Sequence, residues 1–331
     1  MTAEIYHVLR SDQFDRPFLN DLFDITNKLR QISRTKRGAD YLQTLMSNKR
    51  AMLYFTQPST RTFLSFMNAC QILGIKTSEI RDPHTSSEMK GETVEDAIRT
   101  FSSYVDLIIM RSPRAGLADR IANLLDETPR RVPIINGGSG RDEHPTQALL
   151  DIYTLRRSFG KTGGDIDNKK IAMVGDVQRG RTVRSLSHLM RHFENAQIYF
   201  VSPDSLKIAD DLREYLKNEG VEFHETTNFE EVIPEADAIY MTRIQDEHDT
   251  AGESKHIDYS KYHFTHDHLK ILKKDAIIMH PLPRRQEIDV KVDADPRAKY
   301  WRQERNGMWT RVALIAKMFN LHKDITEPYG V

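Results

Sequence analysis

The stretch Ala51-Met-Leu-Tyr-Phe-Thr-Gln-Pro-Ser-Thr-Arg-Thr62 decides the fold class, because it joins a short apolar run to the start of a helix. Apolar residues continue at helical spacing beyond it, at Phe63, Phe66, Met67, Cys70 and Leu73. Gly74 then stands where a helix would end. A short apolar strand that leads directly into an amphipathic helix is typical of a parallel α/β sheet.

The same alternation recurs along nearly the whole chain, in two successive series. Strands are predicted at 51–55, 105–110 and 132–135 in the first series, and at 171–174, 198–201, 238–241 and 276–279 in the second. Segments of helical period lie between these strands. We therefore expect an α/β fold with two parallel-sheet domains, residues 1–150 and 151–305, joined by bridging helices. The helix from His144 to Phe159 would bridge the domains, and a C-terminal helix at 306–322 would pack back on the first one.

The composition is that of an ordinary globular protein and disfavours several function classes. Among the 331 residues, 48 Lys and Arg balance 48 Asp and Glu, and this zero net charge argues against a nucleic-acid partner. The single cysteine, Cys70, rules out an intrachain disulfide and a cysteine zinc site. The N-terminus does not resemble a secretory signal, and no apolar run is long enough to span a bilayer. We expect a cytoplasmic protein with no membrane partner.

Polar residues follow the strands of the first series, where ligands of parallel sheets bind. Ser59, Thr60, Arg61 and Thr62 stand between a strand and a helix, so their hydroxyls, the guanidinium and the first-turn amides can bind a phosphate. The alternative is a helix N-cap beside a surface arginine. Two further donors follow the next strands, Arg111 and His144. A guanidinium and an imidazole can both donate to a polarised carbonyl, which stabilises an oxyanion without a metal.

Arginines also follow the strands of the second series. Arg181 comes after the strand at 171–174, Arg243 and Gln245 come after 238–241, and the segment His280-Pro-Leu-Pro-Arg284 follows 276–279. Two guanidinium groups beyond the phosphate-binding set indicate an acidic second substrate with more than one carboxylate. The alternative for any one of these residues is a solvated surface side chain.

Seven segments together resemble the aspartate carbamoyltransferase catalytic chains of the aspartate/ornithine carbamoyltransferase superfamily. They occur in unbroken order between about Phe18 and Phe319. They are Pro58–Thr62, Met110–Arg111, His144–Gln147, Met173–Asp176 with Gly180–Thr182, Met241–Gln245, His280–Arg284, and Asn306–Gly307 with Arg311.

The resemblance implies a carbamoyl phosphate-binding first domain and an aspartate-binding second domain, with the active site in the interdomain cleft. Thr62, Arg111 and His144 would be catalytic. Carbamoyl phosphate would be bound by Ser59, Thr60, Arg61, Thr62, Arg111, His144, Gln147 and the backbone near Leu282, with a cis Leu282-Pro283 bond. The products would be N-carbamoyl-L-aspartate and phosphate, a step of de novo pyrimidine biosynthesis, formed without a cofactor or a metal.

The resemblance also implies a homotrimer with shared active sites, because the segment Thr85-Ser-Ser-Glu-Met-Lys-Gly91 would bring Ser86 and Lys90 into the site of a neighbouring subunit. On its residues alone, this segment is a solvated connection. Aspartate would be bound by Lys90, Arg181, Arg243 and Gln245. Regulatory chains are a further possible partner.

Several observations leave alternatives open. Gln57, Met89 and Gln286 depart from the family pattern, which bears on loop pairing and domain closure. A carbamoyltransferase for ornithine or another amino acid, and a catalytically silent assembly subunit, remain alternatives. Three weaker patterns do not indicate a binding site. Gly160-Lys-Thr162 is interpreted as a helix end and not a phosphate loop, and Gly175 to Gly180 lacks the intermediate glycine of a dinucleotide fingerprint. His263, His266 and His268 are interpreted as solvated histidines and not metal ligands.

Overall fold

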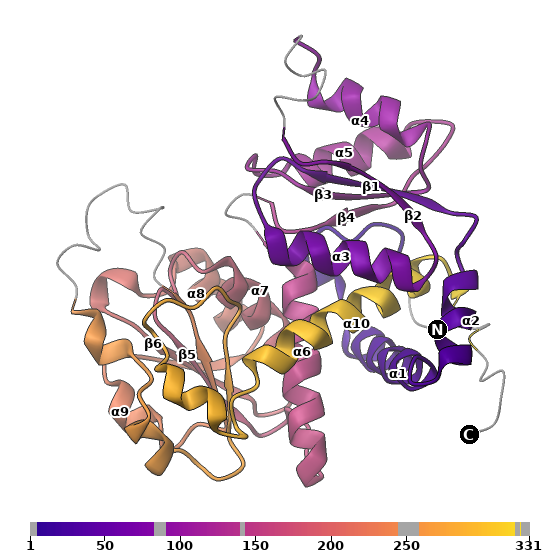
Figure 1. Cartoon of the computed structure of the whole chain (residues 1–331). Helices are drawn as coiled ribbons and strands as arrows, with labels where there is room; N and C mark the ends of the chain where they lie inside the picture. Colours follow the sequence, from indigo (N-terminus) through magenta and orange to yellow (C-terminus); the bar gives the residue numbers. More distant parts are fainter. Residues whose placement is uncertain (1–4, 83–90, 140–142, 244–257, 322–324, 326–331) are drawn as a thin grey trace. The chain divides into compact units, whose positions relative to one another are not determined.

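The computed structural model describes residues 5–82, 91–139, 143–243, 258–321 and 325, and it divides into two compact units. Unit 1 comprises residues 1–149 and 307–331, and unit 2 comprises residues 150–306. Each unit contains one parallel β-sheet with helices, as coloured along the chain in Figure 1. The predicted α/β fold with two parallel-sheet domains is confirmed.

Unit 1 contains a four-stranded sheet in the order β2-β1-β3-β4. Figure 1 shows α4 and α5 on one face of this sheet and α3 on the other. The elements are α1 (Arg16–Ile32), α2 (Lys36–Thr44), β1 (Arg50–Phe55), α3 (Thr60–Ile72), β2 (Lys76–Ile80), α4 (Val94–Ser102), β3 (Leu107–Arg111), α5 (Leu117–Asp126) and β4 (Ile134–Asn136). One short 3-10 helix, Ser11–Gln13, precedes them.

Unit 2 contains a five-stranded sheet in the order β7-β6-β5-β8-β9. Its elements are β5 (Lys170–Val174), α7 (Arg181–Met190), β6 (Gln197–Val201), α8 (Asp210–Asn218), β7 (Glu222–Thr226), α9 (Phe229–Val232), β8 (Ala238–Met241) and β9 (Ile277–Met279). In the described part of this unit, 3-10 helices also occur at Gly160–Thr162, Asp204–Leu206, Tyr259–Tyr262, Asp267–Lys270 and Val290–Ala294. Two long helices, α6 (Pro145–Phe159) and α10 (Tyr300–Met318), each contain a boundary between the units.

The core of unit 2 follows the alternation of its strands. Ala172 and Val174 of β5 are fully buried and pack in one cluster with Phe229 and Val232 of α9. Met173 lies between them in the sequence, and its sulfur instead accepts from the hydroxyl of Ser187 on α7 at 3.7 Å. Because successive side chains of a strand point to opposite faces, α7 and α9 cover opposite faces of the sheet.

Two strands that the sequence did not predict lie at sheet edges. β2 and β7 are polar and half exposed, so they lack the continuous apolar run of a strand covered on both faces. The helices α1 and α2 were also not predicted. The C-terminal helix begins at Tyr300 and not at the predicted residue 306. Its first turn includes the buried Tyr300 and Gln303.

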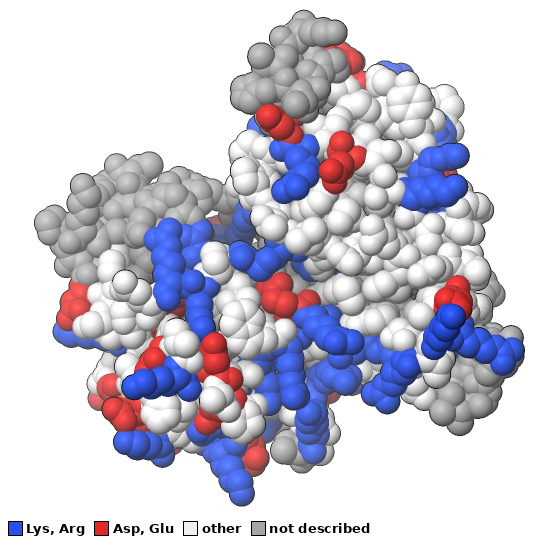
Figure 2. All heavy atoms as spheres, in the orientation of Figure 1, with Lys and Arg blue, Asp and Glu red and all other residues white. Residues whose placement is uncertain are grey.

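The surface carries both signs of charge. On the face shown in Figure 2, Lys and Arg side chains occur together with Asp and Glu side chains. Among the described residues, no helix is both long enough and apolar enough to cross a membrane.

Candidate active site

The predicted phosphate-binding residues stand at the amino end of α3. Ser59 is the N-cap residue of this helix, and its side chain makes no capping hydrogen bond. Its carbonyl accepts the first intrahelical bond, from the Phe63 amide at 3.2 Å, and its hydroxyl is not used to cap the first-turn amides. Thr60 and Arg61 are exposed, and Thr62 is buried. This arrangement favours anion binding over the N-cap alternative, because a capping serine uses its side chain.

Strand pairing brings Arg111 beside this helix start. β1 and β3 are neighbours, and Phe55 pairs with Arg111 at the carboxyl end of both strands. The Arg111 carbonyl accepts from the Gln57 amide at 3.2 Å. Its guanidinium is only 6% exposed, and Nη1 donates to the Gly137 carbonyl at 3.0 Å. A buried guanidinium next to a helix N-terminus is a strong anion-binding combination.

His144 reaches the same place from the start of α6. The ring is 4% exposed, and Nε2 lies 3.4 Å from the Thr62 hydroxyl oxygen. Gly138 lies against the side chains of Arg111 and His144 and has φ +97°. A Cβ on this residue would be 2.7 Å from Arg111 Nη1 and 2.8 Å from His144 Cδ2, so only glycine fits. Thr62, Arg111 and His144 therefore lie close together in unit 1.

Gln147 lies one turn into α6. Its amide donates to the His144 carbonyl at 2.9 Å, and its side chain is buried. The helix thus holds His144 and Gln147 at a fixed spacing.

In unit 2, Arg181 and Arg243 follow two adjacent strands. β5 pairs with β8, and Val174 at the end of one strand lies opposite Met241 at the end of the other. Arg181 begins α7, and Arg243 follows β8 after one residue, Thr242. Burial lowers the pKa of Arg181 below its ordinary value, and the positive charge of Arg243 lowers this pKa further. Two guanidinium groups that follow adjacent strands, one of them at a helix N-terminus, can bind more than one negative charge.

The strand ends in unit 2 pack closely at Gly175. This residue has φ +114°, and a Cβ there would be 2.5 Å from the Thr242 carbonyl oxygen. The Thr242 hydroxyl donates to the Val174 carbonyl at 2.9 Å. Gly175 therefore allows the segments that carry Arg181 and Arg243 to lie side by side.

The segment around Leu282 is held by a buried histidine. Nδ1 of the fully buried His280 accepts from the Leu282 amide at 2.7 Å, so the ring proton is on Nε2, which lies 2.7 Å from a carboxylate oxygen of Glu287. Burial alone would raise the pKa of Glu287, but hydrogen bonds from His280 and backbone amides hold it below the usual range. Leu282 has φ +49°, and its bond to Pro283 is cis, as the resemblance implied.

Behind His280 lies a buried hydrogen-bond chain that sequence reasoning missed. The His280 amide donates to Gln303 Oε1 at 3.0 Å, and Gln303 Nε2 donates to Asp151 at 2.7 Å. Tyr240 donates to the other oxygen of Asp151 at 2.7 Å. A buried polar network of this kind fixes the orientation of its members. A single sequence offers no signal for it, since its members are far apart along the chain.

Some predicted residues lie outside the described residues. These are Ser86, Lys90, Met89 and Gln245. Of the histidine trio, His268 accepts from the Thr265 amide and lies 2.8 Å from Glu230. Within the described part of the chain, no group of three or more His, Cys, Asp or Glu side chains is placed to bind a metal.

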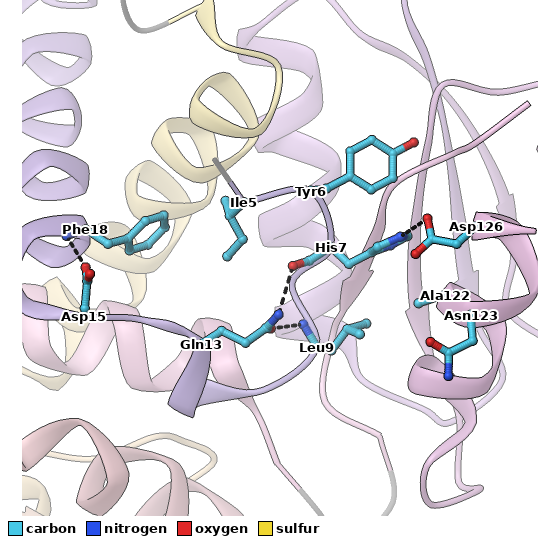
Figure 3. A pocket seen from close by; sticks show the side chains of 10 residues that line it. All are labelled: Ile5, Tyr6, His7, Leu9, Gln13, Asp15, Phe18, Ala122, Asn123 and Asp126. Carbon is cyan, nitrogen blue, oxygen red and sulfur yellow. Dashed lines mark hydrogen bonds and ion pairs between the residues drawn. The ribbon is translucent and has the colours of Figure 1, made fainter. Parts of the chain in front are cut away.

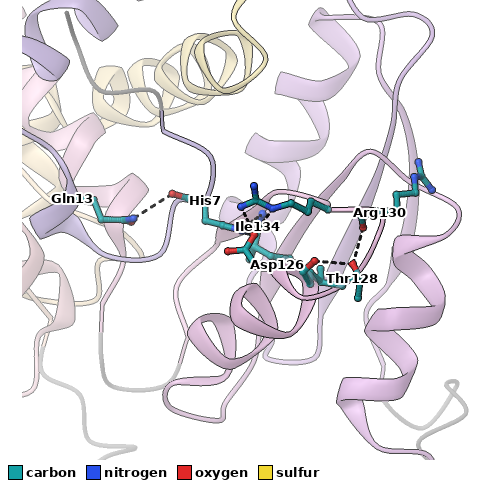
Figure 4. Close-up of polar contacts among 8 residues, drawn as sticks. His7, Gln13, Asp126, Thr128, Arg130 and Ile134 are labelled. Atoms are coloured by element: carbon teal, nitrogen blue, oxygen red, sulfur yellow. Dashed lines mark hydrogen bonds and ion pairs between the residues drawn. The ribbon is translucent and has the colours of Figure 1, made fainter.

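A separate cavity of about 430 Å³ lies beside the N-terminal segment of unit 1 (Figure 3). Three of the polar residues that line it form hydrogen bonds within the chain (Figures 3 and 4). Asp126 accepts from Arg131 Nε at 2.8 Å and lies 3.2 Å from His7 Nε2. Gln13 accepts from the Leu9 amide at 2.7 Å. Burial lowers the pKa of His7, although Asp126 opposes this shift. None of the predicted ligand residues lines this cavity.

The two units with their anion-binding residues define an α/β enzyme for two acidic substrates. The family model of the aspartate/ornithine carbamoyltransferase carbamoyl-P binding domain matches residues 6–157, and that of the Asp/Orn binding domain matches residues 167–318. The chain therefore belongs to the aspartate/ornithine carbamoyltransferase family.

Several relatives are similar along most of the chain. It is 42% identical to the chloroplastic aspartate carbamoyltransferase of Arabidopsis thaliana, over 94% of this chain and 77% of the relative. It is 38% identical to the aspartate carbamoyltransferase catalytic subunit of Methanocaldococcus jannaschii, over 94% of this chain and 97% of that subunit.

Solved structures of aspartate transcarbamoylases are also similar to this chain along most of its length. The M. jannaschii catalytic subunit matches with a TM-score of 0.85 and 36% identity, over 96% of this chain and 99% of that one. The aspartate transcarbamoylase of Trypanosoma cruzi, in complex with N-(phosphonacetyl)-L-aspartic acid, matches with a TM-score of 0.82 and 34% identity, over 93% and 94%.

Proposed function

We propose that the chain is an aspartate carbamoyltransferase, which transfers the carbamoyl group of carbamoyl phosphate to L-aspartate in pyrimidine biosynthesis. The observation that carries the proposal is the pair Arg181 and Arg243, which follow the paired strands β5 and β8; the charge of Arg243 also lowers the pKa of Arg181. An amino acid with two carboxylates complements two guanidinium groups, whereas the side-chain ammonium of ornithine would meet like charge. Relatives named aspartate carbamoyltransferase support the same substrate.

Unit 1 supplies the groups for carbamoyl phosphate. Ser59, Thr60 and Arg61 bind the phosphate with the first amides of α3, and Arg111 adds a buried positive charge. Thr62, Arg111 and His144 donate to the carbamoyl oxygen. These donors already converge around Gly138, so little reorganisation is needed when negative charge develops.

The reaction follows from these positions. The uncharged amine of aspartate attacks the carbamoyl carbon, and a C–N bond forms while the carbonyl electrons move to oxygen. The resulting oxyanion is stabilised by Thr62, Arg111 and His144. The C–O bond to phosphate then breaks, and phosphate leaves with the electron pair and accepts the amine proton. Orientation and fixed positive charge provide the catalysis, with no cofactor in the scheme.

The remaining ligands belong to the same proposal. Gln147 and the Leu282 backbone bind the carbamoyl amino group, and Gln245 binds aspartate with Arg181 and Arg243. Ser86 and Lys90 act in the site of a neighbouring subunit, so the minimal active unit is a homotrimer.

We also propose a cytoplasmic location. The sequence has a single cysteine, the buried Cys70, so no intrachain disulfide can form, as is usual for proteins of a reducing compartment. The plant relatives are named chloroplastic, so fractionation of the source cells tests this location.

A steady-state assay tests the substrate assignment. The purified chain is supplied with carbamoyl phosphate and with L-aspartate, L-ornithine or other amino acids, and the release of phosphate and carbamoylated product is measured. We expect activity with aspartate and none with ornithine. Preferential carbamoylation of ornithine would overturn the assignment, and no transfer to any acceptor would favour a silent assembly subunit.

A further inference from the structure

The N-terminal segment His7–Gln13 runs along the outer edge of β4. The Val8 amide donates to the Ile134 carbonyl at 2.8 Å, and the Asn136 amide donates to the Val8 carbonyl at 2.7 Å. His7 Nδ1 accepts from the Ile134 amide at 3.0 Å (Figure 4). Because β4 is the last strand of its sheet, this segment covers an edge that would otherwise have unpaired backbone groups.

After Val8 the segment folds into a tight turn. Gln13 Oε1 accepts from the Leu9 amide at 2.7 Å and from the Arg10 amide at 2.9 Å. Gln13 Nε2 donates back to the His7 carbonyl at 3.3 Å (Figure 3). This turn fixes Ser11, which is fully buried.

Ser11 contacts the residue directly before His144. The Ser11 amide donates to Glu143 Oε2 at 2.6 Å, and the Ser11 hydroxyl donates to the same oxygen. Both bonds go to a carboxylate, which makes them stronger than bonds between neutral groups. Two residues earlier, the Leu9 carbonyl accepts from Asn136 Nδ2 at 3.0 Å. The stretch Leu9–Ser11 therefore holds both Asn136 and Glu143.

Asn136 and Glu143 stand next to the catalytic groups. Asn136 Oδ1 accepts from the Gly138 amide at 2.9 Å, and Gly138 lies against Arg111 and His144. On the other side, Glu143 forms an antiparallel bridge with Ser139 and precedes His144. Asn136 and Glu143 lie beside Gly138 and His144, whereas residues 59–61 lie at the start of α3, so a shift in Asn136 or Glu143 would act first on the oxyanion donors.

We propose that Ser11 and Glu143 are positioning residues, which hold the His144 imidazole at the distance from Thr62 that carbamoyl transfer requires. The inference rests on the proposed function of His144 and extends it to residues that touch no substrate. A displacement of a donor by about 1 Å can cost about 100-fold in rate, so a contact of this kind matters even though it lies behind the site.

Four variants test the inference: Glu143→Ala, Glu143→Gln, Ser11→Ala and the double variant Ser11→Ala/Glu143→Ala. Glu143→Ala removes the acceptor, while Glu143→Gln keeps an oxygen that can accept both bonds. Arg10→Ala is the matched control, because the neighbouring Arg10 side chain is exposed and pairs with Asp119 on α5 at 3.0 Å. Aspartate carbamoylation gives kcat and KM, calorimetry gives the affinity for carbamoyl phosphate, and thermal unfolding reports the fold.

We expect Glu143→Ala to lower kcat by about 10- to 100-fold. Ser11→Ala should lower kcat less than Glu143→Ala does, because the Ser11 amide still donates to Glu143. The affinity for carbamoyl phosphate and the KM for aspartate should stay within a factor of about two of wild type, as should kcat of Glu143→Gln and Arg10→Ala. The double variant should lose no more than Glu143→Ala alone, because Glu143→Ala already removes both hydrogen bonds from Ser11.

Unaltered kcat in Glu143→Ala would overturn the inference, and so would a Glu143→Gln protein as impaired as Glu143→Ala. If Glu143→Ala fails to fold, Ser11→Ala and Glu143→Gln decide the matter. A wild-type chain that cannot carbamoylate aspartate would instead refute the proposed function. An active wild type with equally active variants refutes only the positioning role.

Discussion

Substitution of Gly138 by alanine tests the convergence of Arg111 and His144 most directly. The added Cβ would stand 2.7 Å from Arg111 Nη1 and 2.8 Å from His144 Cδ2, and ordinary contacts begin at 3.4 Å. One or both groups must therefore move by roughly 0.6 to 0.7 Å. From the sensitivity of rate to such displacements, we expect kcat to fall by about 10- to 100-fold. Because alanine at φ +97° is also strained, stability should fall by about 1–2 kcal/mol.

Gly163→Ala is the control that separates strain from displacement. Gly163 has φ +80°, but an added Cβ would meet nothing within 4 Å. Its stability should fall like that of Gly138→Ala, while kcat in the aspartate carbamoylation assay should stay at the wild-type value. A Gly138→Ala protein with wild-type kcat would refute the idea that Arg111 and His144 act from their positions around this residue.

Three other predictions concern different parts of the chain. Arg61→Ala should weaken carbamoyl phosphate binding in calorimetry, whereas Arg243→Ala should raise the aspartate KM with little change in that binding; the reverse pattern would exchange the roles of the units. The depressed pKa of the Glu287 carboxyl stabilises the fold above the unfolded pKa of about 4.3, and Glu287→Gln should lose this stabilisation. The difference in thermal midpoint between wild type and Glu287→Gln should therefore shrink as pH falls through the folded pKa. An equal gap at all pH values would contradict this. Mixed trimers of Lys90→Ala and Arg111→Ala chains should regain activity after subunit exchange, and continued inactivity after mass spectrometry shows exchange would argue against shared sites.

The sequence alone was sufficient to predict the strands with continuous apolar runs and the polar residues that follow them. β8 was predicted with its observed bounds, and β1 and β5 each begin one residue before their predicted starts. Fully buried parallel strands need apolar residues on both faces, which makes them visible in a single sequence. The polar edge strands β2 and β7 have one neighbour each and half-exposed side chains, so no such run marks them.

The sequence by itself determined which chemical groups the chain possesses, because a strand end followed by Ser59–Thr62, Arg111 or Arg243 is a local pattern. The tertiary structure alone decided which of these groups meet. The register of β1 and β3 places Arg111 beside the start of α3, and Gly138 brings it against His144. The contact of Ser11 with Glu143 joins residues 132 positions apart. No local periodicity encodes such contacts, because they depend on how strands pair and how closely backbones approach.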